Sequence, residues 1–163
     1  MVMLTRRELL SGAGALATLA LTGHTLAGCA RARARFSDHP FKLGVASGDP
    51  RPDGVVLWTR LAPEPLKRDG GMGPDPVTVG WEVAEDERMQ RIVQKGTSVA
   101  TADLAHSVHV ELQGLEPARW YWYRFHVGDE VSRVARTRTA PRPDTRPERL
   151  RFAFASCQHW EFG

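Results

Sequence analysis

The feature that most constrains the fold of this chain is a run of alternating aromatic residues. The run Trp-Tyr-Trp-Tyr-Arg-Phe-His-Val occupies residues 120–127. Because side chains alternate between the two faces of a β-strand, a repeat of two residues predicts a strand with two different faces. One face is expected to lie in a core and carries Tyr121, Tyr123, Phe125 and Val127. The other is expected to face outward and carries Trp120, Trp122, Arg124 and His126.

The residues before this run are typical of a tyrosine corner. Leu115 stands six residues before Tyr121, and Pro117 lies between them. In fibronectin-III and immunoglobulin-like sandwiches, a tyrosine at this point bonds through its hydroxyl to the backbone of the corner. The pattern therefore predicts an all-β fold, an antiparallel sandwich of fibronectin-III or immunoglobulin type.

The rest of residues 36–139 has the composition of short strands separated by turns. Glycine and proline gather at 47–54 and 62–76, where we expect a turn and a loop, because proline is excluded from central strands and glycine permits positive φ. Residues 86–94 fit either a strand edge or one helical turn, which Gly96 would end. The remaining expected strands are 41–46, 55–61, 77–83, 97–102, 107–113 and 131–139. About seven strands in roughly 100 residues is the usual size of such a sandwich.

Residues 1–35 are typical of an export signal. Arg6 and Arg7 precede a weakly apolar run at 9–26 that is rich in alanine, glycine and threonine. This is the pattern of a twin-arginine signal, so the expected partner is the twin-arginine translocase. Because glycines and His24 interrupt the run, it would make a poor transmembrane anchor, and a cleaved or lipid-modified signal is favoured.

Cys29 follows Leu-Ala-Gly at 26–28, which looks like a bacterial lipobox. We expect lipid attachment at Cys29 and a membrane lipid anchor. The alternative is cleavage after a small-x-small pattern at 30–32 or 32–34, which would release a soluble protein. In either case the protein would be periplasmic, attached to the cell surface or extracellular. With Cys29 at the processing site and Cys157 near the end of the sequence, the two cysteines do not indicate a disulfide framework.

The basic character of the chain belongs to this leader. The formal net charge is +3, and the first 35 residues contain five arginines and one glutamate, which leaves a charge of −1 for residues 36–163. A duplex-binding domain needs a basic stripe of its own. Nucleic acid is therefore not an expected partner.

A second strand-like pattern follows a linker. Residues 140–149 contain three prolines and three arginines, a composition typical of an extended, solvated linker. Leu150, Phe152 and Phe154 then alternate with Arg151 and Ala153, and Cys157 follows. Open α/β sheets place their chemistry at the carboxyl ends of strands. We expect residues 150–163 to be the start of a truncated α/β domain.

Three stretches together resemble the PhoD-type alkaline phosphatase family. They are Phe-Lys-Leu-Gly-Val-Ala-Ser-Gly-Asp-Pro at 41–50, Val-Leu-Trp-Thr-Arg at 56–60 and Phe-Ala-Phe-Ala-Ser-Cys-Gln at 152–158, behind a twin-arginine leader. The resemblance implies a secreted metallophosphoesterase that hydrolyses phosphomonoesters and phosphodiesters, with its catalytic domain beginning at 150. By this resemblance Cys157 is a thiolate ligand of Fe³⁺, assisted by Ca²⁺. The other metal ligands have no positions in this sequence, so the 163 residues are expected to be inactive and to hold no cofactor.

Other candidate groups are weaker. Asp49 and Asp53 could bind calcium through oxygen, but aspartate before proline or glycine is an ordinary turn residue, and the turn is favoured. His106 and His109 are three residues apart, which on a strand places them on opposite faces and argues against a shared metal. His159 would either line the entrance of a site at Cys157 or lie on the surface.

No catalytic residue and no cofactor-binding residue is assigned within this sequence. Ser47 and Ser156 lack the context of a serine hydrolase. The outward aromatic residues of 120–127 form either a solvent-exposed stripe or a platform for the catalytic domain, and docking is favoured. Two functional classes stay open, an N-terminal fragment of a metallophosphoesterase and an exported non-catalytic β-sandwich binding module.

Overall fold

The computed structural model describes residues 35–146 and 148–149. These residues form strands and loops, with one short 3₁₀ turn, η1 (Ala102–Leu104). The strands are β1 (Val45–Arg51), β2 (Gly54–Arg60), β3 (Val77–Ala84), β4 (Ile92–Ala100), β5 (Ser107–Leu112), β6 (Trp120–Val127), β7 (Glu130–Val131) and β8 (Ala135–Arg138). Within the described ranges no helix is long and apolar enough to cross a membrane. The strand expected at 150–156 lies outside the described residues.

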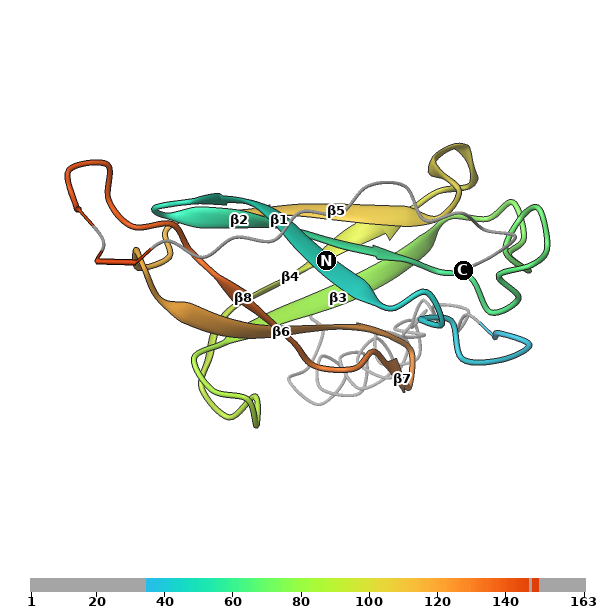
Figure 1. Cartoon of the computed structure of the whole chain (residues 1–163). Helices are drawn as coiled ribbons and strands as arrows, with labels where there is room; N and C mark the ends of the chain where they lie inside the picture. The colour runs from blue at the N-terminus through green and yellow to red at the C-terminus, as the bar shows by residue number, and fades with distance from the viewer. Residues whose placement is uncertain (1–34, 147, 150–163) are drawn as a thin grey trace, which may run out of the picture. The chain divides into compact units, whose positions relative to one another are not determined.

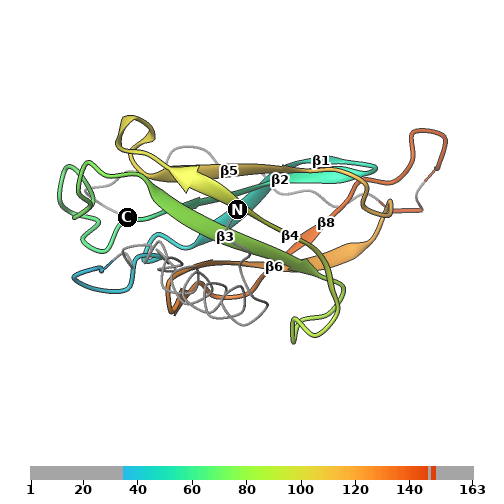
Figure 2. The same ribbon diagram turned by 180° about the vertical axis from the view of Figure 1, so that it is seen from behind.

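The strands form two antiparallel sheets that pack face to face (Figures 1 and 2). One sheet has three strands in the order β1-β2-β5. The other has five, in the order β4-β3-β6, with β7 and β8 both paired to β6. This arrangement is that of a fibronectin-III-like sandwich. The prediction of an all-β antiparallel sandwich is confirmed.

The core lies between the two sheets and follows the expected alternation. In β6 the tyrosines, Phe125 and Val127 are buried, whereas Trp120 is exposed and the other outward residues are partly buried. Val108, Val110 and Leu112 of β5 face them from the opposite sheet. Burying apolar area of this kind is the main favourable term in folding.

The tyrosine corner is present as the sequence predicts. The backbone N–H of Glu116 donates a hydrogen bond of 2.8 Å to the hydroxyl oxygen of Tyr121. Leu115 is buried beside it and its N–H donates to the carbonyl of Asp53 at 2.8 Å. The corner thus ties β6 to the β1–β2 turn.

The first strand differs from the prediction for 41–46. β1 begins at Val45 and continues through the glycine- and proline-rich stretch that was expected to be a turn, so that only Pro52 and Asp53 form the connection to β2. The register shifts between Gly48 and Arg51, and Asp49 adopts a φ of 46°. Pro50 is tolerated because β1 is an edge strand, which does not need every N–H for the ladder.

β4 is one strand where the sequence predicts a break at Gly96. Gly96 pairs with Trp81 in β3, and a Cβ atom at position 96 would lie 2.5 Å from the Trp81 ring. The glycine therefore makes room for an aromatic ring from the next strand and does not end the strand. Of the ambiguous residues 86–94, the last three begin β4. Residues 86–91 form a turn in which the Asp86 carboxylate accepts the N–H groups of Gln90 and Arg91 at 3.2 and 2.7 Å.

The closing strand expected at 131–139 is divided into β7 and β8. Between them the Ser132 hydroxyl accepts the N–H of Phe125 at 2.9 Å, and the Ser132 N–H donates to the Phe125 carbonyl at 2.9 Å. A serine side chain here replaces a regular ladder bond and interrupts the strand.

Candidate functional site

A group of aromatic and cationic side chains lies on the outer face of the five-stranded sheet. The register places Trp122 opposite Arg136 and Trp120 opposite Arg138 across β6 and β8. On the other side of β6, Arg124 lies opposite Glu82 and His126 opposite Gly80. We call this surface the aromatic–arginine face, and it consists of Trp120, Trp122, Arg124, His126, Arg136 and Arg138.

The Trp120 end of this face is exposed and cationic. The Trp120 side chain is 42% exposed. The guanidinium of Arg136 lies 4.4 Å from the Trp120 ring centroid, and that of Arg138 lies 5.5 Å away. Such cation–π contacts contribute about 0.5–1 kcal/mol at exposed sites. Nε of Arg138 donates to the Ala118 carbonyl at 3.3 Å. Among the described residues no salt bridge joins Arg136 or Arg138 to a carboxylate, so neither positive charge is neutralised there.

The other end of the face is closed by contacts within the sheet. Nε and Nη2 of Arg124 both lie 2.7 Å from Oε2 of Glu82. The His126 ring covers Gly80, where an added Cβ would lie 2.2 Å from the ring. These contacts neutralise and fill the His126 end. The accessible part of the aromatic–arginine face is therefore the end around Trp120.

The linker leaves the sandwich at this same end. The Thr139 hydroxyl, which is buried, donates to the Glu116 carbonyl at 2.6 Å and accepts the Arg119 N–H at 3.0 Å. The Ala140 N–H donates to the Arg51 carbonyl at 3.0 Å, and its carbonyl accepts the Ala118 N–H at 3.0 Å. Because Arg138 is the register partner of Trp120, the linker begins two residues after the strand position that lies beside the exposed tryptophan.

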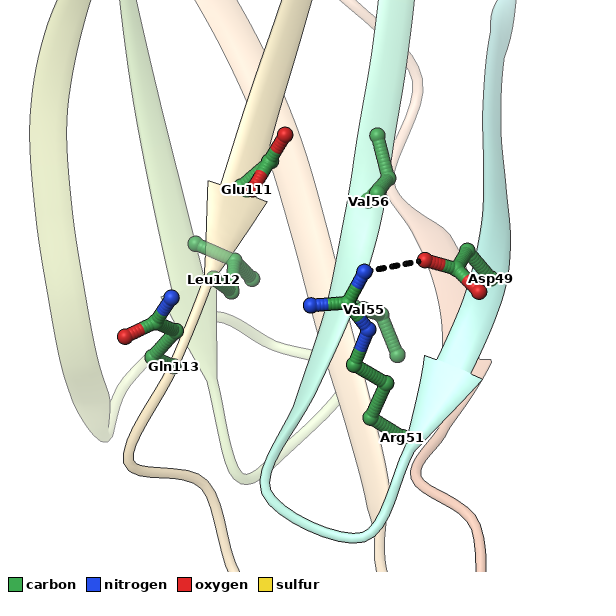
Figure 3. A pocket seen from close by; sticks show the side chains of 7 residues that line it. All are labelled: Asp49, Arg51, Val55, Val56, Glu111, Leu112 and Gln113. Carbon is green, nitrogen blue, oxygen red and sulfur yellow. Dashed lines mark hydrogen bonds and ion pairs between the residues drawn. The ribbon is translucent and has the colours of Figure 1, made fainter.

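Figure 3 shows a hollow on the outer side of the three-stranded sheet, where Asp49 and Arg51 form an ion pair of 2.8 Å. Its free volume is about 10 Å³, which is close to the smallest space that holds one water molecule. The Asp49 carboxylate is paired with Arg51, but Asp49 lies within β1, at its register shift, and not in a turn. Asp53 does lie in the β1–β2 turn, where its carbonyl accepts the Leu115 N–H.

The two central histidines are not brought together. His106 is buried in the turn before β5, with a φ of 56° and a ring nitrogen 3.3 Å from the Asp75 carbonyl. His109 is exposed and lies opposite Trp58 on the outer side of the three-stranded sheet. His106 thus lies before β5, so the expectation that the two histidines stand on opposite faces of one strand applies only to His109.

Ser47 is an exposed residue of β1, and its side chain hydrogen-bonds to the phenol of Tyr123. Burial raises the pKa of the Tyr123 hydroxyl, while the hydrogen bond with Ser47 and the charge of Arg133 offset part of this effect. Ser47 is therefore a partner of a core tyrosine.

No group of three or more histidine, cysteine, aspartate or glutamate side chains comes together at a metal-binding distance within 35–146 and 148–149. Cys29, Ser156, Cys157 and His159 lie outside the described residues. The predictions made for them stay predictions.

Sequence reasoning missed the two arginines of β8. Arg136 and Arg138 alternate with Thr137, which is buried, so the same two-residue period that identified β6 could have placed them on an outer face. That Trp120 is the neighbour of these arginines could not be predicted from the period, because it depends on the β6–β8 register.

Comparisons with known proteins bear on this domain. Residues 28–141 match the family described as PhoD-like phosphatase, N-terminal domain. The chain is 53% identical to alkaline phosphatase D of Bacillus subtilis (strain 168), in a match that covers 97% of this chain and 28% of the relative. The solved structure of PhoD matches with a TM-score of 0.74 and 57% identity, over 78% of this chain and 24% of that one. The chain thus spans about a quarter of the length of the relatives that it matches.

Proposed function

The chain belongs to the PhoD-like phosphatase N-terminal domain family, and from this membership we propose that it is the N-terminal part of an exported phosphoesterase of the alkaline phosphatase D type. The observation that carries the proposal is the identity of 53% to alkaline phosphatase D across almost the whole chain. The proposed substrates of the whole protein are phosphomonoesters and phosphodiesters.

The proposed metal cluster belongs to the domain that begins at residue 150. The described residues offer no group of three metal donors, so the sandwich does not fit such a cluster. Cys157 is the proposed thiolate ligand of Fe³⁺, as the resemblance of residues 152–158 to the family implies. When bound, iron and calcium would supply Lewis-acid polarisation of the phosphoryl group and an activated nucleophile.

The sandwich itself has a proposed mechanical role. Its aromatic–arginine face would hold the following domain in a fixed orientation through Trp120, Arg136 and Arg138. The exposed tryptophan and the two arginines without carboxylate partners support this role. The linker of residues 140–149 starts beside Trp120, and ten residues reach at most about 35 Å when fully extended. The following domain would therefore stay within reach of the face.

We also propose that the protein is exported and lipid-anchored. Arg6 and Arg7 would direct the folded protein to the twin-arginine translocase, and Cys29 would carry the lipid anchor. A folded-protein route suits an enzyme whose metals are inserted before export.

The enzymatic proposal is tested at Cys157. In the whole phosphatase, Cys157→Ser should remove iron and abolish hydrolysis of bis-p-nitrophenyl phosphate, with iron measured by elemental analysis. The 163-residue chain should show neither activity nor stoichiometric iron, since metal sites need about three protein ligands or more. Cys29→Ser is the matched control and should retain both. Full activity of Cys157→Ser, or metal-dependent hydrolysis by the 163 residues, would overturn the assignment.

The docking role has a separate readout. Arg149, which is followed by Leu150, gives trypsin a cleavage site at the end of the linker, whereas the bonds after Arg142 and Arg146 precede proline and resist trypsin. In the whole protein, Trp120→Ala should accelerate cleavage of the linker, because the two domains would separate more often. Trp58→Ala, on the outer side of the other sheet, is the control. Equal cleavage rates in the parent and in Trp120→Ala would contradict docking at this face.

A further inference from the structure

We propose that β4 is a self-association edge, at which two copies of the chain pair antiparallel about a two-fold axis through Thr97. The pairing would join the two five-stranded sheets into one continuous sheet. This inference does not depend on the phosphatase assignment, because it rests on β4 alone.

The first observation is that β4 has an open edge. It stands at the end of its sheet and pairs only with β3 among the described strands. From Gln94 to Ala100 the pairing with β3 is regular, residue by residue, and the only register shift lies before it, at Val83 and Ala84. An edge of this kind presents a row of backbone N–H and C=O groups that a further strand can take up.

The other edges of the sandwich carry features that discourage pairing. β1 has the register shift, the positive φ of Asp49 and Pro50. β8 is only four residues long, and its outward residues are arginines. The outward residues of β5 are polar: Ser107, His109 and Glu111. Short length, charge, proline and irregularity are the usual protections of strand edges.

β4 lacks most of these protections and exposes apolar side chains instead. Val99 is 53% exposed, more than any other large apolar residue within a strand. Lys95 is the single charged residue between Ile92 and Ala100, and the strand contains no proline. Ile92 and Val93 of the same strand are 37% and 41% exposed, so β4 carries three exposed apolar side chains. A regular edge strand with exposed apolar side chains is a site where a further strand can pair.

The sequence of β4 is complementary to itself in one register. With Thr97 on the two-fold axis, Thr97 faces Thr97 of the second copy, and Lys95 faces Val99. Gly96 then faces Ser98, and Gln94 faces Ala100. No two like charges oppose each other, threonine pairs are favourable across strands, and the lysine stem can cover the exposed valine.

The same register matches the two faces of the sheet. Lys95, Thr97 and Val99 pair with Glu82, Gly80 and Thr78 of β3, which place them on the outer side of the five-stranded sheet. Because residues that oppose each other differ by an even number of positions, outer residues meet outer residues. Both aromatic–arginine faces would consequently lie on the same side of the joined sheet.

The experiment is sedimentation velocity of the whole 163-residue chain over a concentration series. The parent should change from monomer to dimer as its concentration rises. Val99→Lys would place a lysine opposite Lys95 twice in each dimer and should raise the dissociation constant at least tenfold. Val99→Glu would place a carboxylate opposite Lys95 and should leave the dissociation constant equal to that of the parent or lower it.

Two further measurements isolate the register. The double variant Lys95→Glu with Val99→Lys places a glutamate of one copy opposite a lysine of the other. It should restore the dimer that Val99→Lys alone loses. Added salt should weaken the Val99→Glu dimer and strengthen association of Val99→Lys, because screening acts oppositely on attraction and repulsion. Since Val99 is largely exposed, circular dichroism should show the parent fold in each variant.

Three results would overturn the proposal. The first is that the parent is monomeric at every concentration. This result would overturn the proposal even if the parent bound an extended peptide. The second is equal behaviour of Val99→Lys and Val99→Glu, which places any association elsewhere. The third is failure of the charge exchange to restore the dimer in a variant that circular dichroism shows to be folded.

Discussion

The hydroxyl oxygen of Tyr121 accepts the backbone N–H of Glu116 at 2.8 Å, across the corner that joins the two sheets. Tyr121→Phe removes this acceptor without changing the packing of the ring. We expect it to lower the free energy of unfolding by about 1 kcal/mol, the net value of one hydrogen bond. Denaturant titration measures the loss. Thr78→Ser, at an exposed position of β3, is a control that should stay close to the parent, and an unchanged midpoint in Tyr121→Phe would show that the bond contributes nothing.

The β1–β2 hairpin contains two glycines with opposite surroundings. A Cβ at Gly54 would lie 2.1 Å from the Leu112 carbonyl oxygen, whereas a Cβ at Gly48 would meet nothing within 4 Å. Gly54→Ala must therefore move the backbone of β2 away from β5, and we expect a loss on the order of 3 kcal/mol, the upper range for overpacking. Gly48→Ala should be nearly neutral in the same thermal or denaturant experiment. Equal stability of the two variants would contradict the close approach.

Tyr123 makes stability sensitive to alkaline pH. Burial raises the pKa of its hydroxyl above the ordinary value of 10.0, so the folded chain holds this proton after the unfolded chain has lost it. The stabilisation is complete below pH 10.0 and is lost as the pH rises through the raised pKa of the folded state. Tyr123→Phe should reduce the fall of the unfolding free energy over this range.

The partner of Tyr123 offers an internal check. The hydrogen bond with Ser47 lowers the pKa of the phenol against the effect of burial. Ser47→Ala should therefore raise the pKa of Tyr123 further, which ultraviolet titration of the tyrosines can follow. A lower pKa in Ser47→Ala would mean that the serine does not stabilise the ionised phenol.

The leader predictions are tested by fractionation. Replacing Arg6 and Arg7 by lysine should leave precursor in the cytoplasm, because the translocase recognises the arginine pair. Arg31→Lys with Arg33→Lys, which lie after the apolar run, is the control and should be exported.

Cys29→Ala should release the exported protein from the membrane fraction, because no acyl chain could then be attached. If Cys29→Ala fractionates with membranes as the parent does, the lipobox interpretation is wrong.

Local periodicity was enough to determine much of this domain. The alternation at 120–127 placed each side chain of β6 on its observed face, because the direction of a side chain in a strand depends only on its position in the repeat. The spacing of Leu115, Pro117 and Tyr121 likewise determined the corner. Both patterns are contained within a dozen residues, so no other part of the chain was needed to interpret them.

Contacts between distant strands decided the rest. β4 continues through Gly96 because the Trp81 ring, fifteen residues earlier, occupies the space above it. Trp120 became part of a cationic surface because the β6–β8 register brings Arg136 and Arg138 beside its ring. The residues around a glycine do not show whether it ends a strand or makes room for a ring from another strand. Only the pairing of strands, which is a property of the folded chain, distinguishes them.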